Sequence, residues 1–236
     1  MIPKLNISQN EMDKLVLFSD IGTESVIYKQ PNNNQELFKI YRTPQKIDYY
    51  EQLNHLYSLK NQIQHTDFAH AAIFRDDYFI GSAIKRYDTQ PFIKISALLR
   101  QDPNQAFKVF CQLFQNNQEL MNYYLYYTDY GFSNIMFDEN GNVQILDTAG
   151  NAIKIGIRQS KKLEQKVLAQ LWDLMIFIMD TRYPAYLDKS KDKKRKVKHL
   201  RAIEMKPEFI DLYENNSLTT EVLIDVANYA RRKYYG

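Results

Sequence analysis

The chain has 236 residues, of which 44% are hydrophobic and 25% charged, a composition typical of a folded globular protein that excludes extended disorder. Its 31 Lys and Arg residues against 28 Asp and Glu residues give a net charge of +3, which is too small to predict nucleic-acid or membrane binding. The single cysteine, Cys111, excludes an internal disulfide framework, and no export signal or long apolar run is evident, so we expect a cytoplasmic protein.

The first part of the chain predicts a β-sheet with one helix. Short apolar runs at residues 15–18, 26–28 and 37–41, separated by turn residues, predict three strands. Residues 47–63 place apolar side chains at helical spacing. Two further runs, at residues 71–74 and 78–84, predict a second antiparallel hairpin. We therefore expect a five-stranded antiparallel sheet with one helix.

The pattern becomes mainly helical after residues 88–91, and we place a domain boundary there, giving domains 1–88 and 89–236. Residues 107–124 carry a helical apolar stripe, and residues 163–179 predict a buried helix. Between them, apolar runs at 135–137 and 143–146 predict a hairpin whose loop contains Asn140-Gly141, a pair that favours positive φ. The sequence thus predicts an α+β protein with a sheet-rich first domain and a mainly helical second domain.

Three polar side chains with oxygen donors follow one another at informative spacing in the second domain. Asp129 precedes Asn134 by five residues, and Asp147 follows Asn134 by thirteen, at the end of the predicted hairpin. Phosphoryl transfer needs hard oxygen ligands for Mg²⁺ and a carboxylate that orients or deprotonates the attacking hydroxyl. These residue types meet both needs.

In order and spacing, these residues resemble the protein-kinase superfamily, in which a catalytic Asp is followed by an Asn and, after a hairpin, by a metal-binding Asp. The resemblance covers residues 15–179 and implies a two-lobed kinase-like fold that binds ATP with Mg²⁺. It implies that Asp129 is the catalytic base and that Asn134 and Asp147 are Mg²⁺ ligands. The expected reaction transfers the γ-phosphoryl group of ATP to a Ser, Thr or Tyr hydroxyl of a protein.

The resemblance also implies a nucleotide site in the first domain. Lys39 would be the strand lysine that binds the ATP phosphates, and Glu51, on the following helix, would be its ion-pair partner. Gly22 would belong to the loop that covers the nucleotide. Residues 84–87 would form the hinge between the lobes, and its residues Ile84, Arg86 and Tyr87 would contact adenine.

The sequence departs from the family pattern in several places. Tyr127 stands where most protein kinases have a His before the catalytic Asp, and Gly131 and Ser133 stand where a loop cation is expected. Gln170 replaces an Asp that the family has two residues before Trp172. Few residues separate Asp147 from the buried helix. These departures leave open a small-molecule kinase, a nucleotide-binding pseudokinase that acts as a scaffold, and transfer of another group from ATP.

Structural roles are the competing interpretation for each residue taken singly. Asp129 and Asn134 could cap turns, Lys39 could be an ordinary edge-strand lysine, and Glu51 could be a solvated helix residue. The basic run at residues 189–201 could bind an acidic partner, but a solvated face is the simpler interpretation. Asp147-Thr148-Ala149-Gly150 also resembles a GTPase switch, yet the phosphate-binding loop that such enzymes need is missing.

Overall fold

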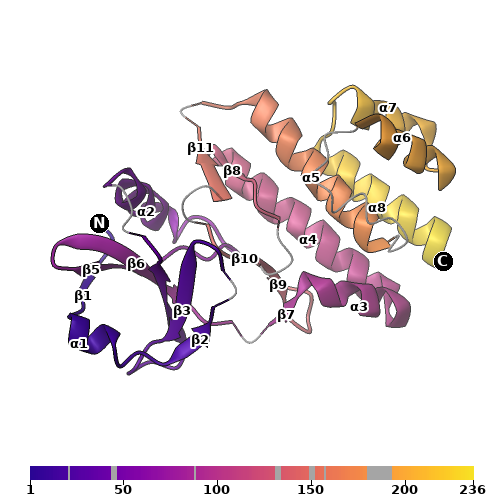
Figure 1. The fold of residues 1–236 in the computed structure, drawn as a ribbon. Helices are drawn as coiled ribbons and strands as arrows, with labels where there is room; N and C mark the ends of the chain where they lie inside the picture. The colour runs from indigo at the N-terminus through magenta and orange to yellow at the C-terminus, as the bar shows by residue number, and fades with distance from the viewer. Residues whose placement is uncertain are drawn as a thin grey trace. The chain divides into compact units, whose positions relative to one another are not determined.

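The computed structural model describes residues 1–20, 22–43, 47–87, 89–130, 134–148, 152–156, 158–179 and 193–236. The chain is α+β and divides into two compact units (Figure 1). The first unit comprises Met1–Asp88 and Ile145–Ala152, and the second comprises Thr89–Gln144 and Ile153–Gly236. The assignment of a nucleotide-binding lobe and a catalytic lobe stays a prediction.

A six-stranded sheet forms the centre of the first unit. In spatial order its strands are β1 (Lys4–Asn6), β5 (Ala71–Arg75), β6 (Tyr78–Lys85), β4 (Glu36–Tyr41), β3 (Ser25–Lys29) and β2 (Leu17–Ser19). The five predicted strands are all present. The expectation of a purely antiparallel, five-stranded sheet was wrong, because β1 adds a sixth strand that pairs with β5 in parallel. Parallel pairing joins segments distant in sequence and has no local turn signal.

The two faces of this sheet are covered by different segments. On one face, α2 (Ile47–Leu59) packs Tyr50 and Leu53 against Tyr41 and Phe79. On the other face, the chain before β2, including α1 (Gln9–Met12), covers the core around Phe38 and Ile73. The predicted helix is confirmed, although it ends at Leu59 instead of residue 63.

Helices dominate the second unit. They are η1 (Phe92–Lys94), α3 (Ile95–Gln101), α4 (Pro103–Asn122), α5 (Lys161–Met179), α6 (Lys193–Ala202), α7 (Pro207–Glu214) and α8 (Thr220–Tyr235). The predicted buried helix is α5, where Trp172 is fully buried. The predicted stripe at residues 107–124 belongs to α4, which packs against α8. It starts earlier than predicted because Asp102 caps its N-terminus by accepting a hydrogen bond from the Gln105 amide.

Short strands connect these helices. The strands β7 (Gln90–Pro91), β9 (Ile135–Phe137) and β10 (Val143–Ile145) form one small sheet, which confirms the predicted hairpin. Gly141 in its loop has φ of +83°, as its Asn-Gly pair predicts. A second pair joins β8 (Leu125–Tyr127) to β11 (Ile153–Ile155). Within the described parts of the chain, none of the helices combines the length and hydropathy that crossing a membrane requires.

Candidate active site

Lys39 and Asp147 form an ion pair in the first unit. Lys39 lies in the middle of β4, directly opposite Ser82 of β6, and only 8% of the residue is exposed. Its Nζ donates a hydrogen bond to Oδ1 of Asp147, which is 108 residues further along the chain. The structure therefore brings together two of the residues that the sequence selected for phosphate and metal binding.

The segment that carries Asp147 is hydrogen-bonded to the chain before β5 on both the N-terminal and the C-terminal side of Asp147. The Asp67 amide donates to the Ile145 carbonyl at 2.8 Å, and the Ile145 amide donates to the His65 carbonyl at 3.0 Å. Beyond Asp147, the Thr148 hydroxyl donates to the Asp67 carbonyl at 2.7 Å. Asp147 itself has φ of +52°, an uncommon conformation for a residue other than Gly. Backbone and hydroxyl contacts thus fix the turn that directs Asp147 toward Lys39.

The two partners of this pair differ in their access to solvent. The Lys39 side chain is 10% exposed, so its ammonium needs an anion close by, whereas the Asp147 side chain is 37% exposed. The Asp147 carboxylate can therefore meet a ligand from solvent while it holds Lys39 in place.

Two tyrosines missed by the sequence reasoning lie beside this pair. Tyr41 of β4 and Tyr49 of α2 pack edge to face with ring centroids 5.2 Å apart, and Lys39 Nζ lies 5.9 Å from the Tyr41 ring centroid. Burial raises the pKa of Tyr49 to about 12, and the negative charge of Asp147 adds to this. Burial also raises the pKa of Tyr41 well above 10. Both hydroxyls therefore remain protonated at neutral pH. Only the helical spacing of Tyr49 relative to Leu53 and Leu56 could have indicated its inward position.

Glu51 is not brought to Lys39. It is exposed on α2, and no ion pair between Glu51 and Lys39 forms among the described residues. The inward positions of the helix are taken by Tyr50 and Leu53, which are buried, so Glu51 points away from the sheet. The carboxylate partner of Lys39 comes from the segment after β10 instead.

The turn between β2 and β3 is fastened by an arginine. Arg42 donates to the Gly22 carbonyl through Nη2 at 3.1 Å and Nε at 3.3 Å, and it forms an ion pair with Asp20. A side chain at position 22 would bring its Cβ within 2.9 Å of the Ser25 carbonyl oxygen, so the tight turn favours Gly. Arg42 places a cation at the predicted nucleotide-covering loop that the sequence reasoning did not select. Ile21 of this loop lies outside the described residues.

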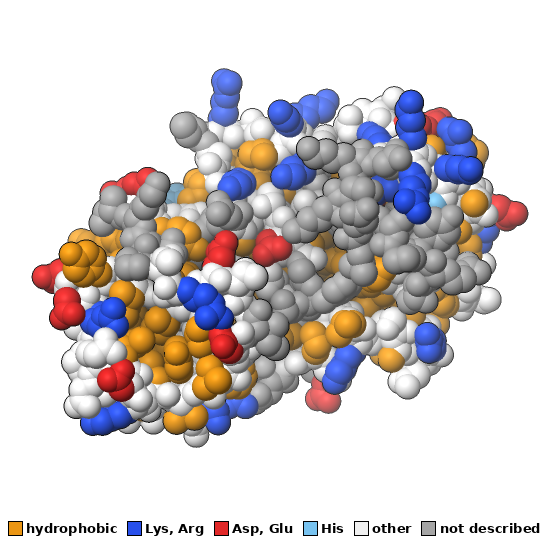
Figure 2. Space-filling view, viewed as in Figure 1, with side chains coloured by type: hydrophobic (Ala, Val, Ile, Leu, Met, Phe, Trp, Pro, Cys, Tyr) orange, Lys and Arg blue, Asp and Glu red, His pale blue; other side chains and the backbone are white. Residues whose placement is uncertain are grey.

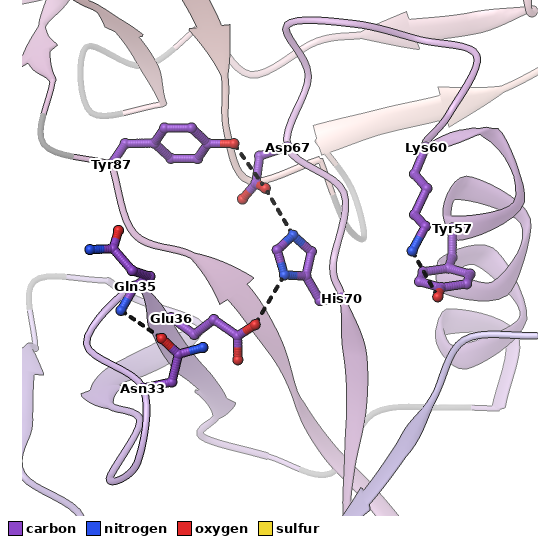
Figure 3. Close-up of polar contacts among 8 residues, drawn as sticks. All are labelled: Asn33, Gln35, Glu36, Tyr57, Lys60, Asp67, His70 and Tyr87. Atoms are coloured by element: carbon purple, nitrogen blue, oxygen red, sulfur yellow. Dashed lines mark hydrogen bonds and ion pairs between the residues drawn. The ribbon is translucent and has the colours of Figure 1, made fainter.

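The predicted hinge residues continue from β6. Ile84 pairs with Leu37 of β4, and the Arg86 amide donates to the Gln35 carbonyl at 2.7 Å. The Arg86 guanidinium lies 5.6 Å from the ring centroid of Phe18. The Tyr87 hydroxyl donates to the buried carboxylate of Asp67 at 3.3 Å (Figure 3). The sequence reasoning missed Asp67, and no local pattern marks it.

Asp129 and Asn134 contact each other in the second unit. The Asn134 side-chain amide donates to Asp129 Oδ2 at 3.0 Å and to the Asp129 carbonyl at 3.3 Å. The loop starts from the fully buried strand β8, and the Tyr130 hydroxyl anchors it by donating to Asn117 of α4. Asp129 is exposed. Gly131 and Ser133, where a loop cation was expected, lie outside the described residues.

The basic run at residues 189–201 is only partly described, from Lys193 onward as α6. Lys and Arg side chains are visible over α6 and α7 in Figure 2. Several are engaged within the protein. Lys196 pairs with the buried Asp173, and Lys193 donates to the Glu214 carbonyl at 2.7 Å. The described part of this run therefore contributes to internal packing.

The residues present fit Mg²⁺ and ATP. Mg²⁺ is usually held by one or two carboxylates together with phosphates and water, not by a cage of side chains. No cluster of three His, Cys, Asp or Glu side chains occurs in the described ranges. In the first unit, Asp147 offers a partly exposed carboxylate beside a buried ammonium. In the second unit, Asn134 has a carboxamide oxygen and Asp129 an exposed carboxylate.

No protein-family model matches this sequence, and no curated protein matches it.

Proposed function

We propose that this chain is an ATP- and Mg²⁺-dependent phosphotransferase with the two-lobed organisation of protein kinases. In this proposal the first unit binds the nucleotide and the second supplies the catalytic loop. The observation that carries the proposal is the ion pair between Lys39 and Asp147. A buried lysine paired to a carboxylate costs desolvation and is weak evidence for a purely stabilising role. A pair with one buried and one partly exposed partner is well suited to bind phosphate and metal.

Each of the candidate site residues has one role in the proposed reaction. Lys39 binds phosphate oxygens, while Asp147 and Asn134 supply oxygen ligands. Mg²⁺-ATP, when bound, supplies the γ-phosphoryl group and a metal that neutralises its charge. Asp129 orients the acceptor hydroxyl and takes its proton as the new O–P bond forms and the bond to the departing ADP breaks. Arg42, at the loop that contains Gly22, is a candidate for the cation missing from the catalytic loop.

The acceptor that we propose is a Ser, Thr or Tyr hydroxyl of a protein. A small hydroxyl compound is the second candidate, and the short chain after Asp147 favours it. Only residues 148–160 separate Asp147 from the start of α5, and within them Ile153–Ile155 is paired with β8. This leaves little chain for a peptide-binding segment. Incubation with Mg²⁺-ATP and either protein or small-molecule acceptors, followed by mass spectrometry, distinguishes the two because the transferred phosphoryl group is found on the acceptor.

A nucleotide-binding pseudokinase is favoured by a different observation. The Asn134 amide occupies one oxygen of Asp129, so the expected base and a metal ligand contact each other directly. In that case Mg²⁺-ATP would bind without release of ADP, and Asp129→Asn would leave the biological activity unchanged.

The experiment that tests the proposal measures thermal stability with and without Mg²⁺-ATP and then ADP release in the same samples. Asp147→Asn and Lys39→Met should lose the nucleotide-dependent rise in Tm, which follows from mass action. The matched controls are Asp211→Asn and Lys29→Met, which change an exposed helix aspartate and an exposed strand lysine. If the wild-type Tm does not rise with Mg²⁺-ATP, or if the control variants lose as much of that rise as the site variants do, the proposal is wrong.

A further inference from the structure

A buried carboxylate lies in the first unit outside the proposed catalytic set. Asp67 precedes β5, and only 5% of its side chain is exposed. Figure 3 shows Tyr87 and His70 pointing toward this carboxylate. The Tyr87 hydroxyl donates to Asp67 Oδ1 at 3.3 Å, and His70 Nε2 lies 3.9 Å from the same oxygen. A buried carboxylate is retained only where such partners compensate for its lost hydration.

His70 connects this carboxylate to a second one. Its Nδ1 lies 3.4 Å from Oε1 of Glu36, the first residue of β4, so the imidazole stands between two acidic groups. The His70 side chain is 39% exposed, whereas Asp67 is almost completely enclosed. His70 is therefore a partly exposed neighbour of the enclosed Asp67 carboxylate.

The main chain of Asp67 supports the segment that carries Asp147. Its amide donates to the Ile145 carbonyl at 2.8 Å and its carbonyl accepts from the Thr148 hydroxyl at 2.7 Å. Its side chain meanwhile contacts Tyr87, in the predicted hinge. One residue thus touches two of the sequence segments of the first unit that the proposed nucleotide site uses.

We propose that Asp67 is a positioning residue that links Tyr87 to the segment at residues 145–148, and that the charge on its carboxylate controls how firmly it holds them. This inference deepens the proposed function and depends on it for its effect on nucleotide binding. The link itself is a property of the first unit and can be measured without a nucleotide.

The charges that face Asp67 set the direction of the effect. Burial raises the pKa of Asp67 to about 7, against the lowering influence of the Tyr87 hydrogen bond and of Lys85. Burial and the charge of Asp67 raise the pKa of Tyr87, so Tyr87 remains a hydrogen-bond donor. The other facing groups are His70 and Glu36. When pH rises through neutrality, Asp67 ionises, and the hydrogen bond from Tyr87, which favours the charged carboxylate, becomes stronger. The link between Tyr87 and the segment at residues 145–148 should tighten.

The first arm of the test uses no nucleotide. Amide NMR shifts of residues 145–148 and of Tyr87 are followed from about pH 5.5 to about pH 8.5 in the wild type, in Asp67→Asn and in the control Asp77→Asn, which changes an exposed turn residue. The wild type and the control should show a shared transition near neutral pH that Asp67→Asn lacks. The same transition in Asp67→Asn, or none in the wild type, overturns the inference.

The second arm measures Mg²⁺-ATP affinity of the same three proteins and of Tyr87→Phe at both ends of this range. The ratio of the wild-type Kd to the Asp67→Asn Kd should fall about fivefold toward high pH, the lower end of typical coupling between sites. Because both proteins bind the same nucleotide at each pH, the titration of ATP itself cancels in this ratio. If all four proteins bind but the ratio is constant, the inference is wrong and the proposed function stands. If none binds nucleotide while the NMR transition is present, the proposed function is wrong and only the structural link stands.

Discussion

The free energy of unfolding should depend on pH through Asp67, and Asp67→Asn should remove that dependence. In the folded protein burial raises the pKa of Asp67 from its ordinary value of 3.8 to about 7. The unfolded chain therefore holds fewer protons on this group than the folded chain between these two values. Asp67 contributes most stability below pH 3.8, and this contribution is lost as pH rises to about 7.

The magnitude follows from the width of this window. Each pH unit changes the free energy of unfolding by about 1.36 kcal/mol while the unfolded carboxylate is ionised and the folded one is not. Two units, from about pH 5 to about pH 7, give about 2.7 kcal/mol. Asn has nearly the shape of Asp and does not ionise. As pH rises across this window, the free energy of unfolding of Asp67→Asn should therefore increase by this amount relative to that of the wild type.

Urea unfolding at several pH values measures this difference directly. Other titrating groups affect both proteins alike, so only the difference between Asp67→Asn and the wild type is interpreted. Asp77→Asn, at an exposed residue, should show a constant difference. A difference between Asp67→Asn and the wild type that stays constant within about 0.5 kcal/mol would refute the burial and pairing assigned to Asp67.

Four further outcomes follow from the candidate site. Lys39→Met should lower the free energy of unfolding by roughly 1 to 2 kcal/mol, less than for a fully buried pair, because the Asp147 side chain is 37% exposed; denaturant unfolding tests this. Tyr49→Phe keeps the ring packing and should change stability by only about 1 kcal/mol, but should reduce the Mg²⁺-ATP-dependent rise in Tm. Glu51→Gln should change the free energy of unfolding by no more than about 0.5 kcal/mol and should leave the Mg²⁺-ATP affinity, measured by calorimetry, unchanged. If Glu51 formed a functional pair with Lys39, the substitution would lower that affinity. Asp129→Asn should keep the rise in Tm and lose ADP release; retained turnover would contradict its role.

Patterns confined to neighbouring residues predicted most of the fold. The strand runs and the Asn140-Gly141 loop were found because alternation and turn chemistry are local. Strand β1 was missed because its partner β5 is distant in sequence and parallel pairing leaves no turn signal. Local sequence therefore identifies elements more readily than it identifies their partners.

The candidate site shows the same limit at the level of side chains. Lys39 and Asp147 were selected by the order of residues along a family pattern, and the structure pairs them. Glu51 was selected by the same pattern, but helix phase turns it outward. The contact of Tyr87 with Asp67 and His70 was missed because Tyr87 was selected only as a hinge residue, and no local motif marks Asp67 or His70. Such a cluster becomes visible only when burial and distance are known.

The proposed reaction separates into binding and chemistry. Lys39 and Asp147 lie in one compact unit, and Asp129 and Asn134 lie in the other. Because Asn134 is proposed as a Mg²⁺ ligand and Asp129 as the base, nucleotide-dependent stabilisation should persist when Asp129 alone is altered. A chain that has lost turnover should still keep the Lys39–Asp147 pair, because the proposed nucleotide binding requires it. In this proposal an active kinase and a nucleotide-binding scaffold would differ in the catalytic loop, where Asn134 contacts Asp129.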